Sequence, residues 1–171
     1  MTSDQYIHSF PPISNHNVSQ LILGSMPGKA SLSANQYYGH PRNNFWKFID
    51  SIKGIQQSLP YEARCEKLAD SGIAIWDVLK TCTRTSSLDS DIVESSIVAN
   101  DFEAFFKLNP NVTNIYFNGA MAEKSYIKHV LPHLSARHSL IQTTRLPSTS
   151  PANASIPMDV KLKQWSVIAI S

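Results

Sequence analysis

Four short runs rich in apolar residues recur along the chain, and each is followed by residues that favour turns. The runs lie at 20–24, 72–76, 113–117 and 139–143. Apolar runs of this length, without strict alternation, are typical of strands that are buried on both faces of a sheet. We therefore predict a strand at each of the four places.

Apolar residues between these runs follow a helical period. The aromatic and aliphatic residues at 45, 48, 49 and 52 fall at i, i+3, i+4 and i+7, and Gly54 is expected to end that helix. Asn100 and Glu103 have the spacing of an N-cap and its reciprocal partner, which predicts a helix over 102–108. Further helices are predicted from Pro60, over 120–130 and over 158–170. The end of the last one could also be a strand.

Strands that alternate with helices are typical of a parallel sheet between helices. No repeat, low-complexity tract or linker divides the sequence, so we predict one domain that spans residues 1–171. Parallel sheets bind ligands beyond the carboxyl ends of their strands. Candidate chemistry is therefore expected in the segments that follow the predicted strands, 24–28, 77–84, 118–119 and 144–153.

The first of these segments, Gly24-Ser-Met-Pro-Gly28-Lys29, is only partly similar to a phosphate-binding loop. The Walker A pattern has one more residue between its glycines, and it requires Ser or Thr where Ala30 stands to bind magnesium. Hydrolysis of a nucleoside triphosphate is therefore disfavoured. What remains is a stiff turn, which is either a plain strand-to-loop connection or a close approach of the backbone to a ligand.

Residues 36–46 combine rings with hydrogen-bonding groups just before a predicted helix. The tyrosines can stack on a base, and His40 and Arg42 can contact phosphates. Asn43 offers a donor and an acceptor on one rigid amide. The alternative is structural, because Asn43 could cap the helix while the aromatic residues that follow belong to the core.

Two further segments offer polar groups at the ends of strands. Two prolines stiffen the loop at 145–154, and its hydroxyls at Ser148, Thr149 and Ser150 can donate to phosphate oxygens. A plain surface loop is the alternative there. Asp77, at the end of the second predicted strand, either reads an N–H group of a ligand or caps the next segment.

Charge and cysteine content exclude several classes of function. The net charge of +2 argues against non-specific coating of nucleic acid, although a local basic groove stays open. Cys65 and Cys82 cannot supply a four-thiolate cluster, and the histidine spacing predicts no zinc site. The sequence has neither a leader-like N-terminus nor an apolar run of about 20 residues. We therefore expect a soluble, cytoplasmic protein that uses no metal and no cofactor.

Four stretches, taken together and in order, match one known family. They are Leu23-Gly-Ser-Met-Pro-Gly-Lys-Ala-Ser-Leu32, Tyr37-Tyr-Gly-His-Pro-Arg-Asn-Asn-Phe-Trp46, Gly72-Ile-Ala-Ile-Trp-Asp-Val78 with Ser87-Leu-Asp89, and Leu146-Pro-Ser-Thr-Ser-Pro-Ala-Asn153. With them the chain resembles the uracil-DNA glycosylase superfamily, most closely its DNA-deoxyinosine (hypoxanthine-DNA) glycosylase branch. The resemblance implies a three-layer α/β/α sandwich around a central four-stranded parallel sheet.

The activity implied by the resemblance is base excision from DNA. A deaminated base, chiefly hypoxanthine, is flipped out of the helix, and water attack at C1′ hydrolyses its N-glycosidic bond. No residue is marked as a Schiff-base lysine, so we expect a monofunctional enzyme without lyase activity. The implied partner is double-stranded or single-stranded DNA that contains a damaged base, and we expect the enzyme to act as a monomer.

The resemblance also implies which residue handles the attacking water. Most superfamily members place Asn or Asp at the third position of the first motif, where this chain has Met26. In the deoxyinosine branch the role falls on the asparagine of the His-Pro-Arg-Asn segment, which is Asn43, with Asn44 as the neighbouring alternative. An amide orients water but is not a strong base, so electrostatic stabilisation of the departing base must contribute more.

The other implied roles concern the base and the DNA backbone. The resemblance implies that Tyr38 stacks on the flipped base and that Asp77 reads its N1–H. The backbone of Gly24, Ser25 and Met26 is implied to contact the same base. The implied DNA contacts are Lys29, His40, Arg42, Arg145, Pro147, Ser148, Thr149 and Ser150.

Two other functions stay open at this point. One is a uracil-directed or mismatch-directed glycosylase on the same fold. The other is a catalytically silent module that binds nucleic acid. The decisive feature is Met26, because without an acid or amide there the activity depends on whether Asn43 reaches the sugar.

Overall fold

The structure is a computed structural model that describes residues 6–169. At its centre lies a parallel sheet with the spatial order β3-β2-β6-β7, formed by β2 (Gln20–Gly24), β3 (Ile73–Asp77), β6 (Asn114–Asn118) and β7 (Gln142–Leu146). β2 and β3 are buried along their whole length, as their apolar runs predict for strands covered on both faces. The predicted four-stranded parallel sheet is confirmed.

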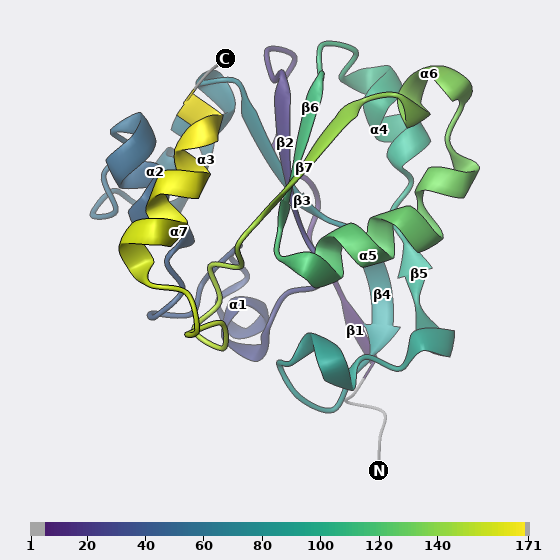
Figure 1. Ribbon diagram of the computed structural model, residues 1–171, viewed down its shortest axis with the longest axis horizontal. Helices are drawn as coiled ribbons and strands as arrows, with labels where there is room; N and C mark the ends of the chain where they lie inside the picture. The colour runs from purple at the N-terminus through teal and green to yellow at the C-terminus, as the bar shows by residue number, and fades with distance from the viewer. Residues whose placement is uncertain (1–5, 170–171) are drawn as a thin grey trace.

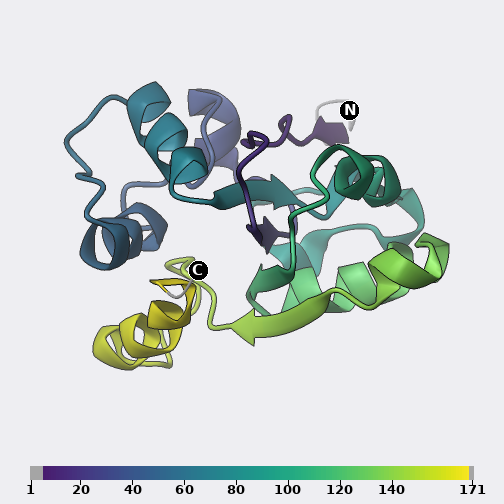
Figure 2. The same ribbon diagram turned by 90° about the horizontal axis from the view of Figure 1, so that it is seen from above.

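Helices cover both faces of this sheet, as the two views in Figures 1 and 2 show. One face carries α2 (Phe45–Lys53), α3 (Tyr61–Asp70) and α7 (Met158–Trp165), and the other carries α4 (Phe102–Leu108) and α5 (Ala120–His129). The predicted three-layer α/β/α sandwich is therefore confirmed. The apolar side of α2 faces the core, where Phe45, Phe48 and Ile49 are buried.

Several helix ends follow from local signals. Gly54 comes directly after α2 with a φ of 71°, a left-handed conformation that glycine adopts at low cost. α3 begins directly after Pro60, as predicted. The last predicted helix, 158–170, is divided into α7 and the 3-10 helix η5 (Ser166–Ala169), and residue 170 lies outside the described residues.

The fourth strand lies three residues later than predicted. Ser139, the expected start of the strand, is instead the last residue of the short helix α6 (Ala136–Ser139). The strand itself, Gln142–Leu146, is mostly polar because it forms the exposed edge of the sheet. Arg145, which was expected in the following loop, therefore lies on the strand.

The predicted capping pair at the start of α4 is wrong. The N-cap is Asp101, whose Oδ1 accepts a hydrogen bond at 3.1 Å from the backbone N–H three residues on. Asn100 instead donates from Nδ2 to the carbonyl oxygen of Asp77 at 2.8 Å. Glu103 accepts from the backbone N–H of Ser135 rather than from the cap. Asn100 thus ties the end of β3 to the segment that leads into α4.

A second, antiparallel sheet was not predicted. It has the order β1-β4-β5, formed by β1 (Tyr6–His8), β4 (Leu79–Thr83) and β5 (Val98–Ala99). Since β4 follows β3 after a single residue, this sheet holds the segment between β4 and β5 close to the carboxyl ends of the parallel strands (Figure 1). That segment contains the 3-10 helices η2 (Asp89–Asp91) and η3 (Glu94–Ser96).

Two shorter helices complete the architecture. α1 (Lys29–Ala34) follows β2 at the carboxyl end of the sheet, and η4 (Leu131–His133), which contains Pro132, follows α5. In the part of the chain that is described, no helix has the length and apolarity needed to cross a membrane.

Candidate active site

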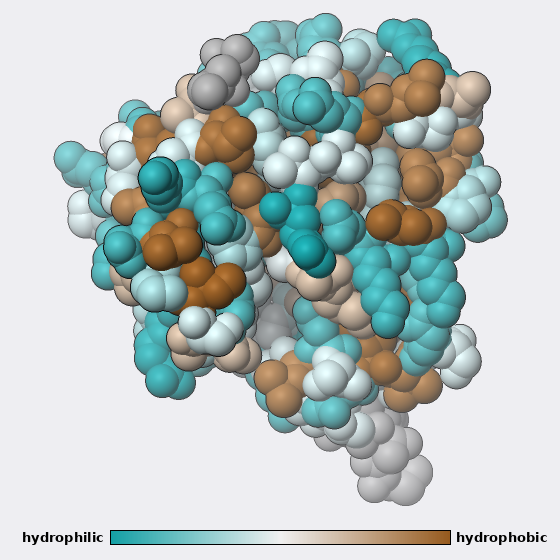
Figure 3. Space-filling view, in the orientation of Figure 1, coloured by the Kyte–Doolittle hydropathy of each residue, from teal (hydrophilic) through white to brown (hydrophobic). Residues whose placement is uncertain are grey.

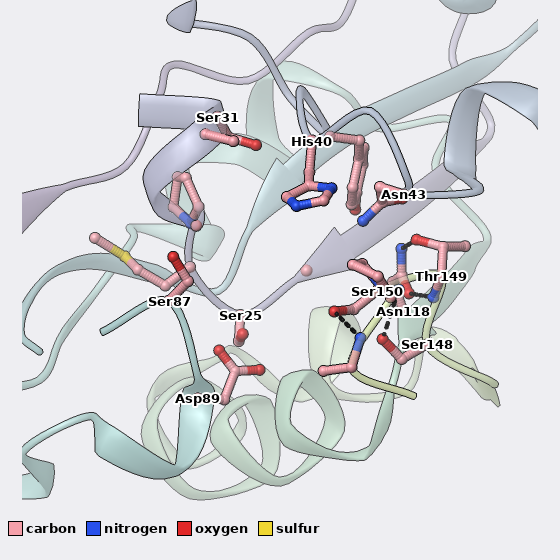
Figure 4. Close-up of a pocket in the computed structure, with 18 of the residues that line it drawn as sticks. Ser25, Ser31, His40, Asn43, Ser87, Asp89, Asn118, Ser148, Thr149 and Ser150 are labelled. Carbon is pink, nitrogen blue, oxygen red and sulfur yellow. Dashed lines mark hydrogen bonds between the residues drawn. The ribbon is translucent and has the colours of Figure 1, made fainter. Parts of the chain in front are cut away.

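A pocket of about 510 Å³ opens at the carboxyl ends of the parallel strands. It lies where the strand order switches, because the chain moves from β2 to β3 on one side and later to β6 on the other. Loops that leave a sheet in opposite directions at such a point leave a crevice between them. Figure 3 shows the hollow on the molecular surface, and Figure 4 shows the side chains that line it. They come from segments 24–31, 37–43, 87–90 and 148–153, and from Asp77 and Asn118.

Gly24, at the end of β2, has no side chain and so leaves room for the buried carboxyl group of Asp77. A Cβ added to Gly24 would lie 2.6 Å from Oδ1 of Asp77 and 3.3 Å from the hydroxyl oxygen of Tyr38. The backbone of Gly24 and Ser25 is paired with the next strand, since their carbonyl oxygens accept from the N–H groups of Val78 and Leu79. Only glycine lets the two strand ends approach this closely.

Asp77 is 3% exposed and lines the pocket. Its Oδ2 atom has no hydrogen-bond partner among the described residues. Burial, together with the negative charge of Asp89 and against the guanidinium of Arg84, raises the pKa of this carboxyl to about 7. A buried carboxyl with an unused oxygen is costly unless a ligand binds it, so this group is a candidate for contact with a substrate.

A second carboxyl group lines the same pocket, that of Asp89 in segment 87–90. Burial raises the pKa of Asp89, and it outweighs the hydroxyl of Ser25 and the charge of Arg84, which lower that pKa. Figure 4 shows Ser25 and Asp89 pointing toward each other. Arg84 is buried beneath the pocket and donates from Nη2 to the carbonyl oxygen of Pro27 at 2.5 Å. Arg84 therefore supports the turn after β2 from below.

Asn43 performs a structural role and also lines the pocket. Its Oδ1 accepts the backbone N–H of Phe45 at 2.9 Å, a turn that starts α2. The amide nitrogen points into the pocket in Figure 4. Asn44 is not among the lining residues, and its backbone N–H donates to the carbonyl oxygen of Thr149. The geometry thus places Asn43, and not Asn44, at the pocket, whereas the N-cap residue of α2 is Asn44 and not Asn43 as the structural alternative expected.

Tyr38 is fixed by packing before any ligand binds. Its ring stacks on Phe45 with centroids 4.1 Å apart and an angle of 21°. Its backbone has a φ of 57°, which is uncommon for a residue other than glycine. Burial raises the pKa of its hydroxyl. The strained backbone and the stack together hold the ring at the pocket wall.

The loop after β7 is built by its own hydroxyl groups. Thr149 and Asn118 exchange two hydrogen bonds of 2.9 Å, and the side chain of Thr149 is completely buried. Ser148 Oγ accepts the backbone N–H of Ser150, whose own hydroxyl accepts that of Ala152 (Figure 4). The hydroxyl of Thr149, expected to contact DNA, is therefore directed inward and shapes the loop instead.

α7 anchors this loop from behind. Lys161, only 3% exposed, donates from Nζ to the carbonyl oxygen of Ser148 at 3.1 Å and to that of Asn153. Trp165, one turn further on, donates from Nε1 to the carbonyl oxygen of Pro147 at 2.8 Å. Pro147 itself is not a lining residue. Two buried donors at i and i+4 thus bind the two halves of the loop.

The expected cationic groups do not all meet at the pocket. Lys29 and His40 line it, and the backbone N–H of Lys29 donates to the hydroxyl of Ser87. Arg42 is exposed outside the lining residues. Arg145 lies on β7, where it forms an ion pair with Glu123 at 3.6 Å. The prediction that Arg145 lies in the loop at the pocket is wrong.

Several lining and supporting residues were not predicted as functional. Asn118, Asp89, Arg84 and Lys161 had no assigned role in the sequence. For Lys161 a signal existed, because it shares one side of the final helix with Trp165 at a spacing of four. For Asn118 the signal was its place at the end of a predicted strand.

Comparisons of the sequence with known proteins all point to one family. The sequence pattern of the family described as "Uracil DNA glycosylase superfamily" matches residues 11–167. A hypoxanthine DNA glycosylase from Methanosarcina barkeri is 41% identical over 111 residues, which cover 64% of this chain and 69% of that protein. A hypoxanthine DNA glycosylase from Methanosarcina acetivorans is 37% identical over 145 residues, which cover 84% and 86%.

A solved structure is similar along almost the whole chain. It is a solution NMR structure of a candidate uracil DNA glycosylase from Methanosarcina acetivorans, and it superposes with a TM-score of 0.80 at 33% sequence identity. The superposition covers 96% of each chain. The similarity therefore extends to the sheet, to both helical layers and to the loops around the pocket.

Proposed function

The chain belongs to the uracil DNA glycosylase superfamily, and we propose that it is a DNA-deoxyinosine glycosylase that removes hypoxanthine from DNA. Two relatives that are 41% and 37% identical are hypoxanthine DNA glycosylases, which supports this substrate. The observation that carries the proposal is that one pocket holds both the Asn43 amide and the unpartnered carboxyl oxygen of Asp77. These two groups suit the two tasks of the reaction, namely attack at the sugar and recognition of the base.

Asp77 suits the recognition of deaminated bases. Deamination of adenine converts the ring nitrogen N1 from an acceptor into an N–H donor, and it replaces the amine beside it with a carbonyl. An ionised carboxyl accepts that N–H, but it meets only a lone pair on adenine. Sites that pair with a polar group of the correct substrate reject the analogue that lacks it, because a buried group is then left unpaired.

Asn43 is proposed to hold the attacking water. Its Oδ1 is partly engaged with Phe45, and the amide nitrogen is directed into the pocket. The water oxygen forms a bond to C1′ while the bond from C1′ to N9 breaks, and the electron pair of that bond leaves with the base. The water gives up a proton, and a proton is taken up by the departing hypoxanthine. An amide does not remove the proton itself, so fixed dipoles around the departing base must lower the barrier.

Tyr38 and the turn at 24–26 are proposed to hold the flipped base. The ring of Tyr38 is fixed against Phe45 before binding, so stacking on the base requires little further ordering. The loop at 148–153 and Lys29 are proposed to contact phosphates. Loop backbone N–H groups and hydroxyls that stay accessible are suited to phosphate oxygens.

A monofunctional monomer is the simplest form of this enzyme. Asn43, Asp77 and Tyr38, the residues proposed to act on the sugar and the base, all line one pocket of the chain, so the proposed reaction requires no residue from a second copy. Lyase chemistry needs an amine that attacks C1′, whereas the attack proposed here is by water, which forms no covalent bond between the enzyme and the sugar. The expected product is therefore an intact strand with an abasic site.

A panel of duplex oligonucleotides tests the proposal. Each carries one hypoxanthine, uracil, xanthine or mismatched thymine, and strand breaks are scored with and without alkali. We expect the fastest cleavage at hypoxanthine, and only after alkali. Preferred cleavage at uracil would instead support the uracil-directed alternative, because the N3–H of uracil also suits Asp77. Undetectable cleavage of all four would support a silent binding module.

A further inference from the structure

The hydroxyl group of Tyr38 reaches the ends of three neighbouring strands. In the sheet β2 lies between β3 and β6, so Gly24 is paired with Asp77 on one side and ends beside Asn118 on the other. Because Gly24 has no side chain, a space stays open between the Asp77 carboxyl and the Asn118 amide. The place of a Cβ on Gly24 lies 3.3 Å from the Tyr38 hydroxyl oxygen and 2.6 Å from Oδ1 of Asp77. The hydroxyl therefore enters this space from the segment before α2.

Two buried oxygen atoms at this place are unpaired. Within residues 6–169, neither the hydroxyl oxygen of Tyr38 nor Oδ2 of Asp77 has a hydrogen-bond partner. A buried polar atom without a partner costs free energy, and the cost is largest for a charged group. When Asp77 loses its proton, its carboxyl group therefore needs a donor close by.

The amide of Asn118 leaves the Tyr38 hydroxyl able to donate. Oδ1 of Asn118 already accepts the backbone N–H of Thr149, and Nδ2 donates to the hydroxyl of Thr149 (Figure 4). An amide nitrogen carries two hydrogens, so the second one suits the Tyr38 oxygen. Burial and the charge of Asp77 raise the pKa of the Tyr38 hydroxyl, while the Asn118 amide lowers it. Since the first two effects outweigh the third, the hydroxyl keeps its proton and acts as a donor.

We propose that the Tyr38 hydroxyl donates a hydrogen bond, directly or through one water, to the ionised carboxyl of Asp77 and holds it in place to accept the N1–H of hypoxanthine. The two parts of Tyr38 then have separate tasks, because the ring face stacks on the base while the hydroxyl acts through Asp77. The hydroxyl is thus a positioning group. The inference rests on the proposed function and deepens it, since it names a second determinant of base recognition.

Other ionisable groups surround the same carboxyl, so a test must report on Asp77 itself. The groups that act on it or line the pocket with it are Asp89, Arg84, Tyr37, Lys29 and His40. A pH profile of activity combines all of these titrations, and an imidazole also changes charge between about pH 5 and 8. The carbon-13 NMR signal of the Asp77 carboxyl, identified by its loss in Asp77→Asn, follows this one ionisation and requires no turnover.

Tyr38→Phe keeps the ring and removes only the hydroxyl. We expect the pKa of Asp77 to rise by about one pH unit, a roughly tenfold change in the ionisation constant, because the charged form loses a hydrogen bond. The loss of activity on hypoxanthine should be about fivefold or more at pH 6 and should shrink to about twofold or less at pH 9, where both proteins are ionised. Tyr126→Phe, at a buried tyrosine outside the pocket, is the matched control and should change neither the titration nor the activity.

The wild-type protein offers a second measurement that needs no variant. The signal of the ring carbon that bears the Tyr38 hydroxyl should shift with the same midpoint as the Asp77 carboxyl, because the hydroxyl gains an acceptor. A Tyr38 signal that does not follow Asp77 would overturn the inference. An Asp77 pKa that is equal or lower in Tyr38→Phe, or a loss of activity of the same size at every pH, would also overturn it. A wild-type protein that releases no hypoxanthine would overturn the proposed function instead, and the two NMR titrations would still test the contact.

Discussion

Oδ1 of Asp77 lies 2.6 Å from the place that a Cβ on Gly24 would occupy, so the end of one strand determines where the carboxyl group of the next can stand. Real Cβ atoms do not approach an oxygen this closely. Any side chain at position 24 must therefore push the carboxyl of Asp77 out of its present position in the pocket wall.

Gly24→Ala should reduce the excision of hypoxanthine without unfolding the protein. Misplacement of a recognition group by about 1 Å can cost up to about 100-fold in rate, so we expect a loss of at least about tenfold in kcat/KM. Gly28→Ala is the matched control, because a Cβ there would meet only Ser87 at ordinary contact distance, 3.5 Å. Similar losses in both variants would contradict the role given to the Gly24–Asp77 contact.

The activity on hypoxanthine should rise with pH through about 7. The pKa of Asp77 is raised to about 7 by burial and by Asp89, against the opposing charge of Arg84. Only the ionised carboxyl accepts the N1–H of hypoxanthine, so kcat/KM should increase as the carboxyl loses its proton. Asp77→Asn should be much less active and should lack this rise, whereas Asp159→Asn, on the exposed side of α7, should keep it. A wild-type profile that is flat between pH 6 and 8 would argue against Asp77 as the reader of the base.

The same carboxyl links the stability of the protein to pH. In the unfolded chain an aspartate has a pKa near ~3.9, and in the folded protein Asp77 has one of about 7. Between these values the folded state holds a proton that the unfolded state has lost. The stability that this proton contributes is complete below the unfolded pKa and is lost as the pH rises through about 7.

Urea unfolding of wild type and Asp77→Asn at pH 5 and pH 8 measures this linkage. The amide of the variant does not titrate. The free energy of unfolding of wild type should therefore fall, relative to that of the variant, between pH 5 and pH 8. A difference between the two proteins that stays constant would contradict the raised pKa. This outcome would be independent of any result on activity.

Much of the fold could be predicted because burial leaves a clear pattern in the sequence. The runs that became β2 and β3 are apolar throughout, since helices cover both faces of these strands. β7 was misplaced because an edge strand does not need an apolar run, while Leu140 and Ile141 beside it supplied a misleading one. β4 was missed because its sequence, Leu79–Thr83, alternates too weakly to stand out after β3.

The site could be predicted where its residues follow directly from strand ends. Asp77 and the turn after Gly24 are of this kind, and both line the pocket. Arg84 could not be predicted, because its role depends on a carbonyl oxygen 57 residues away. For Lys161 the spacing to Trp165 indicated its side of the helix, but its acceptor, a carbonyl oxygen 13 residues away, could not be predicted. Local sequence carries no record of such contacts, and a buried lysine or arginine looks like any surface residue.

Lys161→Met should weaken the binding of DNA more than it changes the chemical step. The variant keeps the length of the side chain but removes the donors to the carbonyl oxygens of Ser148 and Asn153, so the loop at 148–153 loses its anchor. Unpaired buried acceptors cost about 1–3 kcal/mol, and we expect KM for duplex DNA to rise by about threefold or more. Lys163→Met, on the exposed side of the same helix, should leave KM unchanged. Equal effects of the two substitutions would argue against the anchor.

Single-turnover release of hypoxanthine from a duplex by Asn43→Ala and Asn44→Ala tests the central claim most directly. Both variants should bind DNA, because phosphate contacts dominate affinity. We expect Asn43→Ala to lose about 100-fold or more of the rate, in the range for one key polar group in a transition state. Asn44→Ala should stay close to wild type, since Asn44 is not among the lining residues. Normal release of hypoxanthine by a folded Asn43→Ala protein would contradict the account.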